Sequence, residues 1–169
     1  WGIALAALLR KNGHEITVWS ALETEIEMLR ENHEHKMLPG VKLPEDVVFT
    51  LDEREAAEGK DLLVMSVASS YTRETARRFS PFVAQGQKIL NVAKGIEAHT
   101  QMTLSEIIEQ EIPGADVAVM SGPSHAEEVG RGVPTTIVVG AKTKSTAEFI
   151  RGLFMNEVFR VYISPDILG

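Results

Sequence analysis

The chain has 169 residues, which is the length of one domain. Hydrophobic residues make up 44% of it and charged residues 24%, a globular composition that argues against disordered, collagen-like and coiled-coil proteins. The absence of cysteine excludes disulfides, thiolate metal sites and a cysteine nucleophile. A formal net charge of −7 argues against a general surface for nucleic acid or anionic membranes.

No apolar run approaches the ~18 residues that a membrane span needs, and no signal-peptide pattern opens the sequence. We therefore expect a soluble, cytoplasmic domain without membrane insertion. The sequence starts abruptly at Trp1, directly before an apolar helical stretch, and stops equally abruptly at Gly169. We interpret it as a piece of a longer protein, cut at both ends.

Helix-like and strand-like segments alternate along the first part of the chain. A helix is predicted over residues 3–12, ended by Gly13, because glycine enters the left-handed region without steric cost. A strand over 15–19 and an amphipathic helix over 22–32 follow. The polar segment 33–46 is predicted to be a loop, and loops of this length in compact domains are usually functional.

The alternation continues to the end of the chain. After a short strand over 47–50, Asp52 and Glu55 have the spacing of a capping box, and the apolar run 61–67 predicts a strand covered on both faces. The remaining predicted elements are a helix over 71–79, a strand over 88–92, a helix over 103–110, strands over 117–120 and 135–139, a capped helix from Ser145 and a strand over 158–162. This order predicts an α/β fold with a mostly parallel sheet and helices on both faces.

Ligands of such sheets bind beyond the carboxyl ends of the strands. The turns that follow the predicted strands are rich in small residues, which let a backbone approach a ligand closely, and amides at a following helix start favour an anion. These small residues are Ala68, Ser69, Gly95, Gly122 and Ser124. One cation, Lys94, stands among them, so the sequence indicates a phosphate-bearing ligand.

Four motifs stand in a fixed order along the chain. They are Trp-Gly-Ile-Ala-Leu-Ala from Trp1, Lys-Met-Leu-Pro-Gly-Val-Lys-Leu-Pro from Lys36, Ala-Lys-Gly-Ile-Glu from Ala93, and Ser-Gly-Pro-Ser-His-Ala-Glu-Glu-Val from Ser121. Together they closely resemble the N-terminal half of the NAD(P)-dependent glycerol-3-phosphate dehydrogenases, over essentially the whole chain. Four motifs in register are far more specific than any one of them alone.

The resemblance implies a Rossmann-type, doubly wound sheet whose first strand is missing from this chain. Residues 1–169 would be an incomplete NAD(P)-binding N-terminal domain, and an all-helical substrate domain would follow Gly169. The implied reaction is a reversible hydride transfer between NAD(P)H and dihydroxyacetone phosphate or sn-glycerol 3-phosphate, which supplies phospholipid synthesis. A homodimer through the absent domain is also expected.

The resemblance carries site residues onto matching positions of this sequence. Lys94, Gly122 and Ser124 would bind the substrate, and Ser124 also has the spacing of a capping box with Glu127. Four residues would contact the cofactor: Trp1, Gly2, Lys94 and Ala126. The proton-transferring lysine would lie in the absent domain, so no catalytic residue is assigned in this chain.

The sequence departs from the family where the second strand of the family fold ends. Members often have His-Arg there, which holds the 2′-phosphate of NADP, and this chain has Ala21-Leu22, followed by Glu23 and Glu25. We therefore expect either NAD or NADP as cofactor, with NAD slightly favoured.

Alternatives remain for the function and for two clusters. The function could instead be that of a related two-domain hydroxyacid or ketopantoate-type reductase, or of a non-catalytic dinucleotide-binding sensor. His33 and His35 with neighbouring glutamates could suggest a metal site, but such residues in a polar loop are more often solvated, and we assign no metal. A basic helix face is interpreted as surface charge; it comprises Arg73, Arg77 and Arg78.

Overall fold

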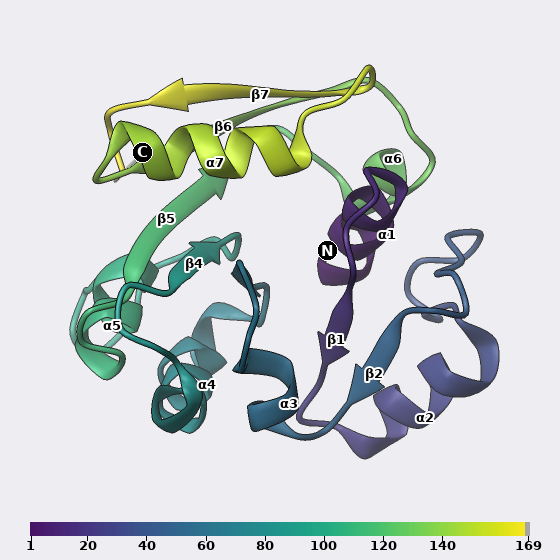
Figure 1. The fold of residues 1–169 in the computed structure, drawn as a ribbon, viewed down its shortest axis with the longest axis horizontal. Coiled ribbons are helices and arrows are strands. Elements are labelled where there is room, and N and C mark those ends of the chain that lie inside the picture. Colours follow the sequence, from purple (N-terminus) through teal and green to yellow (C-terminus); the bar gives the residue numbers. More distant parts are fainter. Residues whose placement is uncertain (168–169) are drawn as a thin grey trace.

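The computed structural model describes residues 1–167, in which helices and strands alternate as predicted (Figure 1). The helices are α1 (Gly2–Lys11), α2 (Glu23–Asn32), α3 (Glu53–Ala57), α4 (Thr72–Phe79), α5 (Leu104–Glu111), α6 (Ala126–Gly130) and α7 (Lys144–Phe154), with 3₁₀ turns η1 (Ser69–Tyr71) and η2 (Ser80–Phe82). The strands are β1 (Thr17–Trp19), β2 (Val48–Thr50), β3 (Leu63–Met65), β4 (Lys88–Asn91), β5 (Asp116–Ser121), β6 (Thr135–Ala141) and β7 (Phe159–Ser164).

The strands form two hydrogen-bonded groups. Five of them make a sheet in the order β3-β4-β5-β6-β7, and β1 pairs with β2 alone. Every neighbouring pair is parallel except β5 and β6, which are antiparallel. The predicted mostly parallel sheet is thus confirmed. The sequence pattern indicated neither the division into two groups nor the reversal at β6, since apolar runs look alike in both directions.

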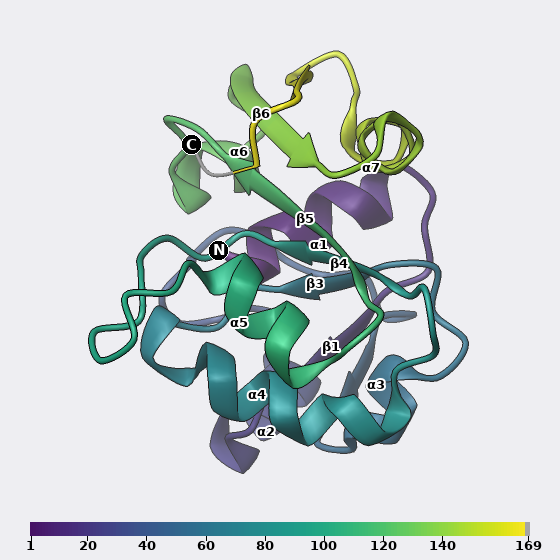
Figure 2. The ribbon, with the colours of Figure 1, turned by 90° about the vertical axis from the view of Figure 1, so that its left-hand side faces the viewer.

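Helices cover both faces of the larger sheet, as predicted. Ile89 and Val117 point into a core shared with α3, α4 and α5, whereas their chain neighbours Leu90 and Ala118 point into a second core shared with α1 and α7. This reversal follows from the two-residue period of a strand. Figure 2 shows α4 and α5 on one side of β3 and β4, and α1 on the other.

Side-chain caps fix several of the helix starts. The carboxylate of Asp52 accepts hydrogen bonds from the backbone N–H groups of Arg54 and Glu55, which confirms Asp52 as the N-cap of α3. The predicted capping box is only half formed, because the N–H of Asp52 donates to the hydroxyl of Thr50 and not to Glu55. The predicted start of α7 at Ser145 is wrong by one residue: α7 begins at Lys144, because the hydroxyl of Thr143 accepts the N–H of Thr146 over 3.2 Å and makes Thr143 the N-cap.

The long loop over residues 33–46 lies outside the helices and strands, as predicted, but it is packed against the core. Leu38 and Val41 are buried in the core under α1. His33 is half-buried with its ring centroid 5.5 Å from that of Phe49, so the interpretation of this histidine as solvated is wrong. Within residues 1–167 no group of three or more histidine, aspartate or glutamate side chains is arranged to hold a metal ion.

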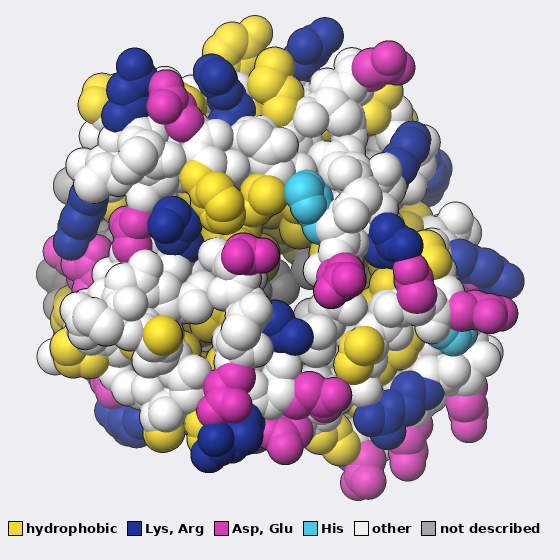
Figure 3. Space-filling model, viewed as in Figure 1, with side chains coloured by type: hydrophobic (Ala, Val, Ile, Leu, Met, Phe, Trp, Pro, Cys, Tyr) yellow, Lys and Arg dark blue, Asp and Glu magenta, His cyan; other side chains and the backbone are white. Residues whose placement is uncertain are grey.

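No helix within the described part of the chain is long and apolar enough to cross a membrane. On the face seen in Figure 3, lysine and arginine side chains alternate with acidic ones, so neither charge sign dominates that face.

Candidate functional site

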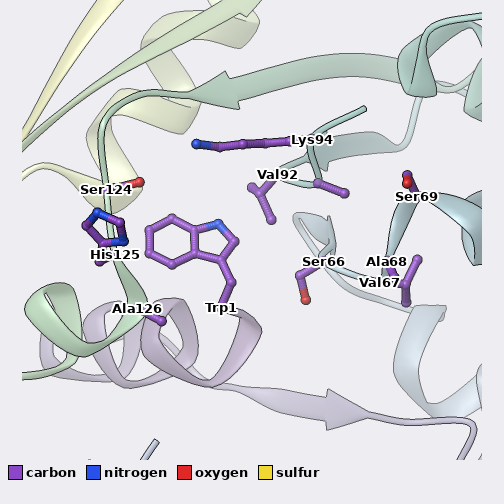
Figure 4. Close-up of a pocket in the computed structure, with 11 residues that line it drawn as sticks. Trp1, Ser66, Val67, Ala68, Ser69, Val92, Lys94, Ser124, His125 and Ala126 are labelled. Carbon is purple, nitrogen blue, oxygen red and sulfur yellow. The ribbon is translucent and has the colours of Figure 1, made fainter. Parts of the chain in front are cut away.

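The carboxyl ends of β3, β4 and β5 open onto one cavity of about 320 Å³ (Figure 4). Its volume is at the lower end of the range for small-molecule sites. Its walls come from the residues that directly follow these three strands, together with the start of α1. The lining residues are Trp1, Ser66, Val67, Ala68, Ser69, Val92, Ala93, Lys94, Ser124, His125 and Ala126.

Trp1 stands at the N-terminal end of α1 with its half-buried indole in the cavity, beside His125 (Figure 4). No side chain caps the first turn of α1. The N–H groups of such a turn are free to bind an anion, and the helix dipole adds favourable charge. Gly2 does not line the cavity; a Cβ atom there would overlap with Oγ of Ser66, so its small size lets α1 approach the end of β3.

Lys94 brings a positive charge to the cavity. Its side chain is exposed and its Nζ donates a hydrogen bond to the backbone carbonyl of Gly122 over 3.1 Å. No ion pair to Lys94 exists among residues 1–167, so its charge is available to a ligand. The turn that carries it is held by the carboxamide of Asn91, which accepts from the N–H of Ala93 and donates to its carbonyl.

Gly122, in the turn after β5, is small for a structural reason. A Cβ atom there would lie 3.1 Å from the carbonyl oxygen of Thr136 and 3.2 Å from Cα of Ile137, both in β6. Gly122 does not line the cavity, although its carbonyl meets Lys94. A close approach of β6 therefore accounts for this glycine, and the expected contact with substrate stays a prediction.

Ser124 lines the cavity, but the capping box predicted for it is wrong. The N-cap of α6 is His125, one residue later, and no side chain caps this helix. The backbone N–H of Ser124 is turned back onto the carbonyl of Gly122 over 3.0 Å. Its hydroxyl has no protein partner within the described chain and faces the cavity with Ala126, the first residue of α6.

The fold thus brings four of the six predicted site residues to one cavity: Trp1, Lys94, Ser124 and Ala126. Gly2 and Gly122 lie directly behind its wall. Among the polar lining side chains, sequence reasoning gave no site role to Ser66 or His125. Ser66 follows β3 immediately, so extending the strand-end rule by one residue would have found it; His125 was inside a quoted motif but carried no separate signal.

The interpretation of the α4 arginines as surface charge is confirmed for Arg77 and Arg78, which are exposed, whereas Arg73 is half-buried; all three make ion pairs. Arg73 donates to Glu97 and Glu111, Arg77 donates to Glu111, and Arg78 pairs with Glu53. Arg73, followed by Thr100, lowers the pKa of Glu97 to about 2 through hydrogen bonds. Arg77 and Arg73 lower the pKa of Glu111 in the same way. These carboxylates lie behind the Lys94 turn rather than in the cavity.

Negative charge lies at the end of β1. The hydroxyl of Ser20 donates to the carboxylate of Glu25 over 2.6 Å and accepts the N–H of Leu22 over 3.1 Å. In dinucleotide-binding folds this strand end faces the adenosine ribose. The side chain of Leu22 is 57% exposed there and brings no charge.

Comparisons with known proteins agree with this architecture. Residues 1–147 match the family described as NAD-dependent glycerol-3-phosphate dehydrogenase N-terminus. Glycerol-3-phosphate dehydrogenase [NAD(P)+] of Agathobacter rectalis is 59% identical over 170 residues, which cover 100% of this chain and 51% of the relative. The enzyme of the same name from Fusobacterium nucleatum is 48% identical over 172 residues, which cover 100% of this chain and 51% of that relative.

A solved structure shows the same fold. The crystal structure of glycerol-3-phosphate dehydrogenase from Coxiella burnetii superposes with a TM-score of 0.93 at 26% sequence identity, over 99% of this chain and 51% of that one. The chain thus spans about half the length of the relatives it matches.

Proposed function

This chain belongs to the family of NAD-dependent glycerol-3-phosphate dehydrogenases, as their N-terminal part. We propose that it takes part in the dehydrogenase reaction of that family. The proposed activity is a reversible hydride transfer between NAD(P)H and dihydroxyacetone phosphate or sn-glycerol 3-phosphate. The relatives are named as dehydrogenases, which favours this activity over a hydroxyacid or ketopantoate-type reductase and over a non-catalytic sensor.

One observation carries the proposal: Trp1 at the start of α1, Lys94 after β4 and Ser124 after β5 line a single cavity. A phosphorylated three-carbon substrate needs a cation and hydroxyl donors, and a dinucleotide needs amides at a helix start. The uncapped first turn of α1 supplies such amides beside Trp1. These residues fit an NAD(P) group, which would supply the hydride when bound.

Lys94 has the central role in this proposal. Its ammonium, anchored on the carbonyl of Gly122, would orient the substrate and stabilise negative charge on an oxygen of the substrate. Ser124 would donate its hydroxyl to the same ligand, and Ala126 would let the cofactor lie close to the backbone. Gly2, behind the cavity wall, would act on the cofactor through the start of α1, which its small size lets approach the end of β3. The group that donates a proton to the C2 oxygen would come from outside this chain.

We propose NAD as the slightly preferred cofactor. The 2′-phosphate of NADP carries nearly two negative charges and usually requires a cation at the end of the strand corresponding to β1. At that position Ser20 holds the carboxylate of Glu25 instead. Repulsion from an exposed carboxylate is screened by salt, so the preference should be modest.

We also propose the wider setting of this chain. β1 and β3 each pair with a single strand within residues 1–167, although Trp19 of β1 packs on the same core as Met65 of β3. A further strand, expected before Trp1, would fit between them. We further propose that an all-helical substrate domain follows Gly169 and that the enzyme forms a homodimer through that domain. We propose a cytoplasmic location and a role in phospholipid synthesis.

The test is an assay of the full-length enzyme that contains this chain. NADH oxidation should depend on dihydroxyacetone phosphate, and unphosphorylated dihydroxyacetone should be a far poorer substrate, since it lacks the anion that Lys94 binds. Equal turnover of the two ketones, or no turnover of either, would contradict the proposed substrate.

A further inference from the structure

Arg73 and Glu97 form a two-pronged ion pair behind the cavity. Nε of Arg73 donates to Oε1 of Glu97 over 2.7 Å, and Nη2 donates to Oε2 over 2.7 Å. This planar fork-to-carboxylate geometry fixes orientation as well as distance, which a lysine cannot do. Glu97 is the third residue after Lys94, so the fork holds the turn that carries the proposed substrate cation.

The remaining donors of Arg73 fix it to α5. Nη1 donates to Oε1 of Glu111 over 2.6 Å and to Oε1 of Gln110 over 2.7 Å. Only 23% of the Arg73 side chain is exposed, with 21% of Glu97 and 14% of Glu111. Arg73 is therefore anchored on one helix while it holds Glu97, and it does not line the cavity. A direct contact between Arg73 and substrate is thus not indicated.

The segment after Lys94 is short and closed on itself. The N–H of Glu97 donates to the carbonyl of Met102 over 3.0 Å, and Ile96 forms an isolated antiparallel bridge with Thr103. Between this closed segment and Lys94 stands only Gly95, whose φ of 127° suits glycine. A shift of Glu97 would therefore also shift the backbone of Lys94, which lies three residues earlier in the chain.

Lys94 itself has little other support. Within residues 1–167 its one side-chain hydrogen bond is to the carbonyl of Gly122, and the Asn91 carboxamide holds the turn only from the preceding side. We propose that Arg73 is a positioning residue, which holds Lys94 at the cavity through Glu97. This inference rests on the proposed function, because it requires that Lys94 bind the substrate.

A double-mutant cycle on the full-length enzyme tests the inference. Arg73→Gln should lower kcat/KM for dihydroxyacetone phosphate by about tenfold, because small misplacements of a binding group are costly. In a Lys94→Ala background the same substitution should have almost no further effect, since a positioning residue acts only through the group that it positions. Arg73→Lys should rescue only part of the loss, because it keeps the charge and loses the fork.

Arg77→Gln is the matched control. Arg77 lies on the same helix and pairs with Glu111, but it does not contact Glu97. An equal loss in Arg77→Gln, an undiminished effect of Arg73→Gln in the Lys94→Ala background, or no effect of Arg73→Gln at all would overturn the inference. Should Arg73→Gln fail to fold, Glu97→Gln replaces it in the same cycle with the same expected outcomes.

The cycle also separates this inference from the proposed function. If Lys94→Ala alone leaves kcat/KM unchanged, the proposed role of Lys94 has failed, and the positioning role fails with it. If Lys94→Ala lowers kcat/KM while Arg73→Gln acts independently of it, only the positioning role has failed.

Discussion

Gly130, the last residue of α6, lies directly against Val41 in the long loop over residues 33–46. A Cβ atom on Gly130 would stand 2.5 Å from Cγ2 and 3.3 Å from Cγ1 of Val41. Val41 is 4% exposed and branched at Cβ, so it cannot rotate away freely. The loop is thereby packed onto the helix whose first residue, Ala126, lines the cavity.

We expect Gly130→Ala to destabilise the protein by about 1–3 kcal/mol, the usual cost of overpacking a core. Adding Val41→Ala should restore most of the loss, because the new methyl group then fills the space that the valine leaves. Gly152→Ala is the control: Gly152 is in α7, no atom lies within 4 Å of its added Cβ, and alanine favours a helix, so stability should rise. The free energy of unfolding in urea is compared for the parent, Gly130→Ala, the double variant Gly130→Ala/Val41→Ala and Gly152→Ala. A Gly130→Ala protein as stable as the parent would contradict this packing.

A second prediction concerns acid stability at Glu97, whose pKa Arg73 and Thr100 lower from 4.5 to about 2. Between these values the unfolded chain binds the proton more readily than the folded chain. The stabilisation of the fold by the ionised Glu97 carboxylate is therefore complete above pH 4.5 and is lost as the pH falls through about 2. Glu97→Gln should therefore be less stable than the parent near neutral pH, and the difference should shrink over that interval.

Glu31→Gln serves as the control for this measurement. Glu31 is exposed on α2 and has no ion pair within the described chain. Because Glu31 makes no ion pair there, the free energy of unfolding of Glu31→Gln should differ little from that of the parent near neutral pH. A Glu97→Gln difference that stays constant from pH 6 to about 2 would argue against the lowered pKa.

A third prediction concerns Lys94. A charge-assisted hydrogen bond to a substrate anion contributes about 1.5–3 kcal/mol. Lys94→Ala in the full-length enzyme should therefore lower kcat/KM for dihydroxyacetone phosphate by at least ~10-fold, with little change in Tm because the side chain is exposed. Lys11→Ala, at the far end of α1, is the matched surface control and should retain its kinetics. Equal kinetics in both variants would make Lys94 an ordinary surface lysine.

The fourth prediction concerns cofactor choice. NADH should be preferred over NADPH, and Leu22→Arg should shift the ratio of the two kcat/KM values toward NADPH by about tenfold or more, the range of one charge-assisted hydrogen bond. Leu22→Gln, which adds length and polarity without charge, should shift it little. A parent enzyme that prefers NADPH would mean that a cation reaches the 2′-phosphate from another part of the fold.

The sequence by itself determined the order of the elements and the edge at which the site lies. Periodicity located the elements to within a few residues, because side-chain spacing along a helix or strand is a local property of the backbone. Lys94 and Ser124 could be assigned to one region, since the carboxyl ends of parallel strands meet at one edge. Local capping chemistry also identified Asp52, whose partners are two and three residues away.

The tertiary structure decided which groups meet across the fold. Arg73 finds Glu97 at a separation of 24 residues and Glu111 at 38, and no local pattern encodes such pairs. No local pattern encodes the need for glycine at Gly122, where the backbone of β6 leaves no room for a side chain, or the antiparallel direction of β6. Periodicity records only which side of an element is apolar, whereas pairing depends on distances set when all elements pack together.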